Sequence, residues 1–285
     1  MKILIISDGK AGHLNQSIAF AKLKNIAYDI IEIKPNKFLK ILSYIFDFLR
    51  LHVNLYGLHV KTSYKAVIST GSSTYYANKY LAKKLNIKSI AIMLPKGFRY
   101  SDFDYILALN HDNPPQCENI IQIPLNLSTN EPKGYIKANN IQKSIGIIIG
   151  GNNSIFIMEK EDIKDILDKV FANFPNHLKY LTTSRRTPKE IDALLKNYTF
   201  DYELIYSKNS SINPIADFID VCDELFITID STSMLSEARA NSDAKIHIIK
   251  LESNKENTKF HKLAQNIEKM KEKFDYMPYL NKVKI

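Results

Sequence analysis

The feature that most constrains the fold is a repeated pattern: a short apolar run, a turn of small residues and then a helix-forming run. The clearest copy spans residues 226–238, FITIDSTSMLSEA, where an apolar run ends at Asp230 and the small residues 231–233 precede a helix-forming run. A helix N-terminus carries unpaired backbone N–H groups and a partial positive charge, which favour phosphate. The segment predicts either an anion-binding turn or a helix that is simply capped by Asp230 or Ser231.

Similar apolar runs occur in both halves of the chain. They lie at 2–6, 65–69 and 88–93 in the first half and at 144–149, 177–182 and 225–229 in the second. Short runs that are apolar throughout are typical of parallel strands buried on both faces. The polar stretch 124–142 separates the two series and predicts a linker. We therefore expect an α/β fold with two Rossmann-like domains, 1–130 and 142–285, facing each other across a cleft, with the last helix packing back on the N-terminal domain.

Composition narrows the class of protein. The hydrophobic content of 45% is that of a globular protein, and the net charge of +9 is compatible with anionic partners. No RNP signature or helix-turn-helix pattern is present, so nucleic acid is not an expected partner. Cys117 and Cys222 belong to no metal-binding pattern, which favours the cytoplasm. No apolar run approaches the roughly 18–20 residues that span a bilayer, and the N-terminal run is too short for a signal peptide.

One segment, residues 38–56, differs from the rest. Its apolar residues follow a helical spacing, it is rich in aromatic residues, and Lys37, Lys40 and Arg50 flank it. Such an amphipathic helix either lies on an anionic membrane surface or packs its apolar face against the protein core. Both interpretations stay open at this stage.

Six motifs give the chain a family resemblance. They are SDGKAGHLNQ at 7–16, Phe103-Asp104 leading to His111-Asp112, Gly-Gly-Asn at 150–152, SRRTP at 184–188, Asn-Pro at 213–214 and DSTSMLSEA at 230–238. In this order they resemble the mitochondrial fission ELM1 family, whose members occur in plants and bacteria. The resemblance implies a GT-B glycosyltransferase fold that holds a nucleotide-sugar donor mainly in its C-terminal domain. One departure concerns the donor pocket: residues 241–245, NSDAK, replace the Gly-Lys-Pro usually expected after the SEA helix.

Glycosyl transfer requires that the acceptor hydroxyl loses its proton. His13 is the first candidate for the general base, because an ordinary imidazole pKa of about 6.5 suits that task near neutrality. Asp8 in the same loop is either an orienting partner or the alternative base. His111 with Asp112 is a second candidate pair. The remaining residues expected on the acceptor side are Gly12, Gln16, Gly71 and Ser72.

The leaving nucleoside diphosphate must also be stabilised. Arg185 and Arg186 are suited to this task because guanidinium groups bind phosphate bidentately and stay charged. No DxD-type motif outside a strand is present, so we expect no metal ion and no cofactor besides the nucleotide-sugar substrate. The expected donor-binding residues are Gly150, Gly151, Asn152, Ser184, Arg185, Arg186, Thr187, Asp230, Ser231, Ser233, Met234, Ser236 and Glu237.

These observations favour a metal-independent GT-B glycosyltransferase. It would move a sugar from a nucleotide-sugar to a cell-envelope acceptor, lipid-linked or of the lipopolysaccharide type, in the cytoplasm at the inner face of the membrane. Two alternatives remain: a non-catalytic recruitment protein of the membrane surface that keeps the fold, and a two-domain nucleotide-sugar epimerase. A nicotinamide dehydrogenase is disfavoured because the first loop lacks GxGxxG.

Overall fold

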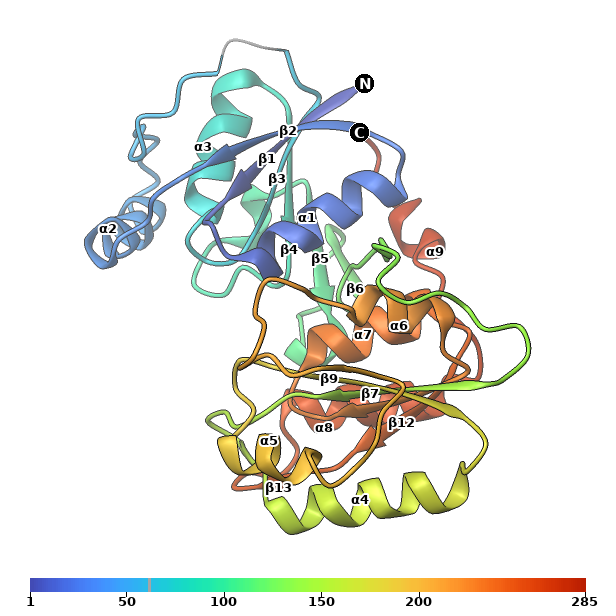
Figure 1. Cartoon of the computed structure of the whole chain (residues 1–285). Helices are drawn as coiled ribbons and strands as arrows, with labels where there is room; N and C mark the ends of the chain where they lie inside the picture. The colour runs from blue at the N-terminus through green and yellow to red at the C-terminus, as the bar shows by residue number, and fades with distance from the viewer. Residues whose placement is uncertain (61–62) are drawn as a thin grey trace. The chain divides into compact units, whose positions relative to one another are not determined.

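The chain forms two compact units, each an α/β fold on a parallel sheet (Figure 1). The computed structural model describes residues 1–60 and 63–285. Unit 1 consists of Met1–Thr129 and Asp275–Ile285, and unit 2 consists of Asn130–Phe274. The stretch expected to be a linker thus falls largely within unit 2, and the C-terminal segment belongs to unit 1.

Unit 1 contains a six-stranded sheet in the order β2-β1-β3-β4-β5-β6 with parallel pairing throughout. Its chain order reverses between β1 and β3, which makes this the topological switch point where open α/β sheets bind ligands. The strands are β1 (Lys2–Ser7), β2 (Ala27–Glu32), β3 (Ala66–Thr70), β4 (Lys88–Ile92), β5 (Tyr105–Leu109) and β6 (Ile120–Ile123). The helices are α1 (Ala11–Leu23), α2 (Lys37–Phe48), α3 (Tyr75–Leu85) and α9 (Met277–Leu280), with 3₁₀ turns η1 (Tyr100–Asp102) and η2 (Asn110–Asp112).

Unit 2 contains a five-stranded parallel sheet in the order β10-β9-β7-β11-β12, which places its switch point between β7 and β11. The strands are β7 (Ser144–Ile149), β9 (Leu178–Thr183), β10 (Tyr202–Leu204), β11 (Glu224–Thr228) and β12 (Lys245–Ile249). Two short strands, β8 (Phe156–Ile157) and β13 (Glu252–Ser253), pair antiparallel beside it. The helices are α4 (Lys160–Asn173), α5 (Lys189–Leu195), α6 (Ile215–Val221), α7 (Thr232–Asn241) and α8 (Lys259–Lys269).

The apolar runs became strands because both of their faces are covered. Every residue of β7 is buried, as an apolar run in a parallel sheet requires. Ile145, Ile147 and Ile149 point into a core that also takes Phe156 and Leu167. The expected α/β fold with parallel sheets is therefore confirmed, and β7 and α3 have the predicted bounds.

Two helices differ from the prediction at their ends. Helix α1 begins at Ala11 and not near residue 15, because Gly9 turns the chain at φ +75° and Lys10 N–H bonds the Asp8 carboxylate at 3.3 Å. Helix α2 ends at Phe48 and not at 56. There Leu51 N–H donates to Phe46 O at 2.8 Å and Arg50 takes a left-handed φ of 57°, which is a Schellman ending without its usual glycine.

Candidate functional site

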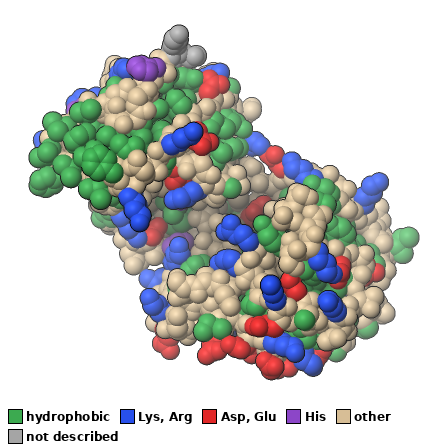
Figure 2. All heavy atoms as spheres, turned by 60° about the vertical axis from the view of Figure 1, so that its left-hand side comes forward, with side chains coloured by type: hydrophobic (Ala, Val, Ile, Leu, Met, Phe, Trp, Pro, Cys, Tyr) green, Lys and Arg blue, Asp and Glu red, His purple; other side chains and the backbone are tan. Residues whose placement is uncertain are grey.

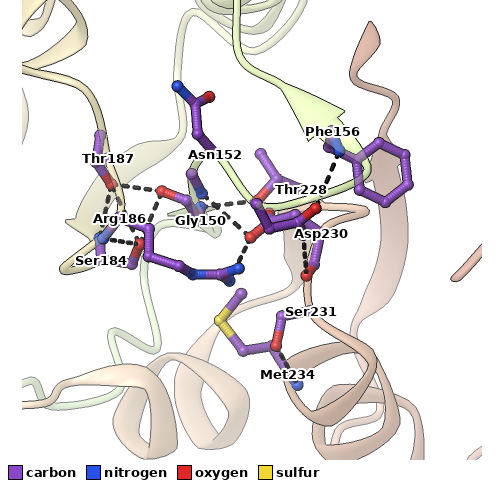
Figure 3. A network of polar contacts seen from close by, with 12 residues as sticks. Gly150, Asn152, Phe156, Ser184, Arg186, Thr187, Thr228, Asp230, Ser231 and Met234 are labelled. Atoms are coloured by element: carbon purple, nitrogen blue, oxygen red, sulfur yellow. Dashed lines mark hydrogen bonds and ion pairs between the residues drawn. The ribbon is translucent and has the colours of Figure 1, made fainter. Parts of the chain in front are cut away.

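In unit 2 the turns that follow β7, β9 and β11 are joined by one buried carboxylate, that of Asp230 (Figure 3). Its Oδ2 accepts hydrogen bonds from Gly151 N at 3.1 Å and from Arg186 Nη2 at 2.6 Å. The Asp230 side chain is fully buried. Burial raises its pKa, against the opposing effects of Thr228, Arg186 and Gly151. Asp230 was expected to bind the donor; the structure gives it the role of holding the turns and positioning Arg186.

The hydroxyl groups of the SRRTP turn also bond within the protein. Ser184 Oγ donates to Gly150 O at 2.8 Å and accepts from Arg186 N at 3.1 Å. Thr187 Oγ1 donates to Gly150 O and accepts from Ser184 N at 2.9 Å. Each hydroxyl has a single hydrogen, so neither is available to phosphate without breaking the turn. In the structure the hydroxyl groups of Ser184 and Thr187 hold the turn, and their binding of phosphate stays a prediction.

The two glycines after β7 are required by the packing of these turns. A Cβ atom at Gly150 would lie 2.0 Å from Asp230 Oδ1, and one at Gly151 would lie 2.1 Å from Arg186 O. The next residue, Asn152, continues the contact by donating its N–H to Arg186 O at 3.2 Å. We expected the glycines to admit a ligand; the space beside them is filled by the protein itself.

The two arginines of the turn differ in their surroundings. Arg186 forms its ion pair with Asp230, so part of its charge is already balanced. Arg185 is exposed, and no carboxylate in the described ranges 1–60 and 63–285 forms an ion pair with it. The full positive charge at this turn therefore belongs to Arg185.

The start of α7 provides the second anion-binding feature. Ser231 caps the helix, because its Oγ accepts a hydrogen bond from Met234 N at 3.3 Å. The first intrahelical bond is donated by Leu235 N, so the N–H groups of Thr232 and Ser233 have no acceptor inside the helix. Ser233 is exposed at this end. Ser236 was also expected to bind the donor, but it is fully buried.

Glu237 lies one turn further along α7. Burial raises the pKa of its carboxyl to about 7, and burial is the sole cause. The side chain still keeps part of its surface exposed. No hydrogen bond or ion pair of its carboxyl is found within the part of the chain that the structure describes. A desolvated carboxyl that keeps an exposed edge is suited to accept hydrogen bonds from a ligand.

In unit 1 the switch point between β1 and β3 holds an Asp–His pair. His13, on the first turn of α1, places Nδ1 at 3.1 Å from both carboxylate oxygens of Asp8. The Asp8 side chain is fully buried and the His13 side chain is 26% exposed. Since a carboxylate only accepts, this contact keeps the proton on Nδ1 and leaves the lone pair on Nε2. The geometry is that of a general base held by an orienting carboxylate.

Gly71, directly after β3, is required by this pair. Its φ is +91°, and a Cβ there would lie 2.4 Å from the His13 ring. We expect Gly71→Ala to destabilise the protein by about 2 kcal/mol and to displace His13. The matched control is Gly12→Ala, because Gly12 is helical and its Cβ would meet no atom within 4 Å. It should stabilise by roughly 0.5–1 kcal/mol. Denaturant unfolding measures both, and equal effects of the two substitutions would contradict this assignment.

The other residues expected on the acceptor side lie at the same sheet edge. Gln16 is buried, donates to Gly12 O at 3.3 Å and keeps its Oε1 without a partner within the described residues. Ser72 is partly exposed. His111 and Asp112 form η2 after β5, and Asp112 pairs with Lys96 at 2.8 Å. In the first of the two predicted pairs, Asp8 and His13 are in direct side-chain contact.

Sequence reasoning missed Lys10. Its ammonium lies 3.4 Å from Asp8 Oδ2 and is largely exposed, so it brings positive charge next to the Asp–His pair. The signal was its place directly after Asp8-Gly9 in a turn.

In residues 1–60 and 63–285 no group of three or more His, Cys, Asp or Glu side chains is placed to hold a metal ion. None of the helices formed by these residues has the length and apolarity that crossing a membrane would require.

Comparison with known proteins identifies the family. The chain belongs to the mitochondrial fission ELM1 family, whose model matches residues 11–274. A relative is the uncharacterized protein RP120 of Rickettsia prowazekii (strain Madrid E), 27% identical over 297 aligned positions that cover 87% of this chain and 83% of the relative. The predicted family membership is thus confirmed.

Solved structures that resemble the chain have low sequence identity. The ADP-heptose lipopolysaccharide heptosyltransferase II of E. coli has a TM-score of 0.49 at 10% identity and covers 94% of this chain and 99% of its own. The UDP-GlcNAc 2-epimerase of Neisseria meningitidis, bound to UDP-GlcNAc, has a TM-score of 0.48 at 11% identity, with coverage of 99% and 94%.

Proposed function

We propose that the protein is a glycosyltransferase that holds a nucleotide-sugar on unit 2 and activates an acceptor hydroxyl with unit 1. Glu237 is the observation that carries the proposal. It is a carboxyl with a pKa raised to about 7 by burial, located on the helix whose N-terminus is suited to phosphate. A buried acid of this kind is a marker of a binding or catalytic site.

The spacing on α7 fits a nucleoside diphosphate. Glu237 follows Ser233 by four residues, which is a rise of about 6 Å along a helix. In this arrangement the diphosphate sits at the N–H groups of Thr232 and Ser233, and the two ribose hydroxyls donate to Glu237. Arg185 supplies the positive charge that balances the leaving diphosphate, so the proposed transfer needs no metal ion.

The proton of the acceptor hydroxyl passes to Nε2 of His13. As the acceptor oxygen forms its bond to the anomeric carbon, the bond from that carbon to the diphosphate oxygen breaks, and the electron pair leaves with the nucleotide. Asp8 stabilises the imidazolium that forms, and Gly71 leaves room for the ring. Both groups lie at the switch point of the unit 1 sheet, where this fold binds ligands.

The acceptor that we propose is a cell-envelope glycan presented at the cytoplasmic face of a membrane. The support is the exposed apolar face of α2 in the same unit, which includes Phe38, Ile41 and Phe48. An exposed apolar face of this kind is typical of helices that lie on a lipid surface.

Calorimetric titration without metal tests the donor assignment. Wild-type protein is titrated with UDP, GDP, CMP, dTDP and ADP. We expect one nucleotide to bind, and Arg185→Ala to weaken it about tenfold or more through loss of a charge-assisted hydrogen bond. Lys189→Ala is the control, since Lys189 is an exposed cation at the start of α5, close to the turn. Arg186→Ala is a poor test because it leaves the buried Asp230 carboxylate without its ion pair.

The outcomes separate the alternative functions. Binding that depends on Arg185, followed by transfer to an added acceptor, supports the proposal. Turnover of the nucleotide-sugar alone into an isomeric sugar would replace it by the epimerase reading. If none of the five nucleotides binds, the recruitment protein is favoured and the transfer proposal fails.

A further inference from the structure

Helix α2 is amphipathic, but it turns its apolar side away from the protein. Phe48 is 80% exposed, Phe38 67% and Ile41 59%, and Ile45 and Leu49 belong to the same face. Figure 2 shows hydrophobic side chains gathered over this helix, with Lys and Arg side chains beside them. The core-packing interpretation thus fails for this exposed face, whereas Tyr44 and Phe46 of the same helix do pack on the core. Large apolar side chains that are exposed next to one another on a protein surface mark a site of interaction.

The inward side of α2 combines two aromatic residues with two buried polar ones, and together they fix this orientation. Tyr44 packs on Phe98 and Phe46 on Tyr76, with ring centroids 4.7 and 6.2 Å apart. Ser43 is fully buried and Asp47 is 5% exposed. Asp47 forms a buried ion pair with Lys79 of α3, and the Arg99 guanidinium donates to its backbone carbonyl. Turning the helix to bury its exposed apolar face would break this buried ion pair and leave Lys79 with Asp102 alone, which is unfavourable.

A basic pocket adjoins the C-terminal end of this helix. Its volume is about 840 Å³, and it is bounded by the segment after α2, by α3 and by the residues that precede β3, β4 and β5. It thus lies at the amino ends of these strands, whereas Asp8 and His13 lie at the opposite edge of the sheet. Nothing in the proposed transfer reaction uses it.

The pocket has an excess of positive charge. Its carboxylates, Asp47, Asp102 and Asp104, all form ion pairs with lysines of its lining. Arg50, Lys65 and Lys83 also line it, and no carboxylate among residues 1–60 and 63–285 is found in an ion pair with them.

His52, which also lines the pocket, has a lowered pKa. The largest cause is burial, and the positive charges of Lys83, Lys79 and Arg99 add to it. Asp102 acts in the opposite direction but does not cancel the shift. The pocket is therefore a cationic hollow that can receive an anion.

We propose that unit 1 docks on an anionic lipid bilayer, with the apolar face of α2 in the interface and the headgroup phosphate of an anionic lipid in the basic pocket. The apolar face and the pocket adjoin each other through Arg50 and Leu51, which follow α2 and line the pocket. Apolar side chains bordered by cations are the combination that anionic bilayer surfaces bind. The inference concerns membrane binding alone and stands or falls independently of the transfer reaction.

Co-sedimentation of the full chain with lipid vesicles tests this proposal. One set of vesicles is phosphatidylcholine and the other is phosphatidylcholine mixed with phosphatidylglycerol. We expect wild-type protein to bind only the anionic set. Removing two pocket cations, as in Arg50→Gln with Lys83→Gln, should weaken binding roughly 25-fold, at about fivefold per cation. Phe48→Ser with Ile41→Ser should abolish it by removing the apolar face.

The control is Lys160→Gln with Lys189→Gln, which removes the same charge from exposed lysines of unit 2 and should bind like wild type. Urea unfolding of every variant shows that its fold is intact, whether or not the protein binds a nucleotide. Equal binding of the pocket variant and the control would overturn the proposal. The proposal would also be overturned if glycerol phosphate bound to the pocket and the protein did not bind to anionic vesicles, since the pocket would then be a site for a free anion. A dimer in solution that Phe48→Ser dissociates would likewise overturn it, because the face would be covered by a second copy.

Discussion

Replacing His13 by glutamine is expected to lower the rate constant of sugar transfer by about a thousandfold, the contribution typical of a general base. Glutamine can donate from its amide to Asp8, so the buried carboxylate keeps a partner and the fold should persist. It cannot take up the acceptor proton. Because the proposed donor-binding groups belong to unit 2, nucleotide affinity should stay within about twofold of the wild type.

Single-turnover assays with the nucleotide-sugar identified by calorimetry and a lipid-linked acceptor measure this effect. Asp8→Asn should lower the rate as well, by about a hundredfold, because the amide no longer fixes the proton on Nδ1. His111→Gln is the informative comparison, since His111 was the alternative base in the sequence prediction. If His111→Gln loses transfer and His13→Gln does not, the roles of the two pairs are reversed.

The parts of the site that could be predicted are those that lie within one turn of chain. Asp8 and His13 are five positions apart, and the strand–turn–helix pattern alone places them together. The N-cap of α7 at Ser231 was likewise readable from the order of its residues. Local spacing of this kind is fixed by backbone geometry, so one sequence suffices to find it.

The contacts that escaped prediction join residues far apart in the sequence. Arg186 and Asp230 are 44 positions apart, and Lys79 and Asp47 are 32 apart. The sequence of the SRRTP turn predicts positive charge suited to phosphate. It does not reveal that the distant Asp230 carboxylate balances the charge of Arg186 and not that of Arg185. For the same reason, Ser184 and Thr187 seemed suited to bind a ligand although their hydroxyls bond to Gly150.

Helix α2 shows a different limit. Its apolar spacing correctly predicted an amphipathic helix and its approximate start, yet periodicity does not determine whether the apolar face turns inward or outward. In the structure the inward side holds the buried Ser43 and Asp47 together with Tyr44 and Phe46, which pack on the core. The contacts that decide the orientation join α2 to residues distant in the sequence, such as Lys79 for Asp47 and Phe98 for Tyr44.

Glu237→Gln is expected to stabilise the protein above pH 7 while it weakens nucleotide binding. The pKa of Glu237 is raised from 4.5 to about 7 in the folded state because the carboxyl is buried. The folded state therefore binds this proton more tightly than the unfolded state. This tighter proton binding contributes to the free energy of unfolding. The contribution is present in full below pH 4.5 and is lost as the pH rises through 7. The loss amounts to at most about 3 kcal/mol, and the partial exposure of the side chain reduces it.

Glutamine has nearly the same shape and never ionises, so it does not suffer this loss. Urea unfolding at pH 8 should show Glu237→Gln to be more stable than wild type by roughly 2 kcal/mol, with the difference vanishing near pH 4.5. Nucleotide affinity should change in the opposite direction, falling about tenfold or more at pH 8, because a carboxylate accepts hydrogen bonds from a ribose diol more strongly than an amide oxygen does. Glu268→Gln is the control, an exposed glutamate of α8 whose replacement should change neither quantity. A protein that keeps a destabilising carboxyl at neutral pH does so for a function, and this pair of measurements decides whether that function is to bind the ribose. If Glu237→Gln is more stable but binds the nucleotide as tightly as wild type, Glu237 does not contact the donor and the placement of the ribose on α7 is wrong.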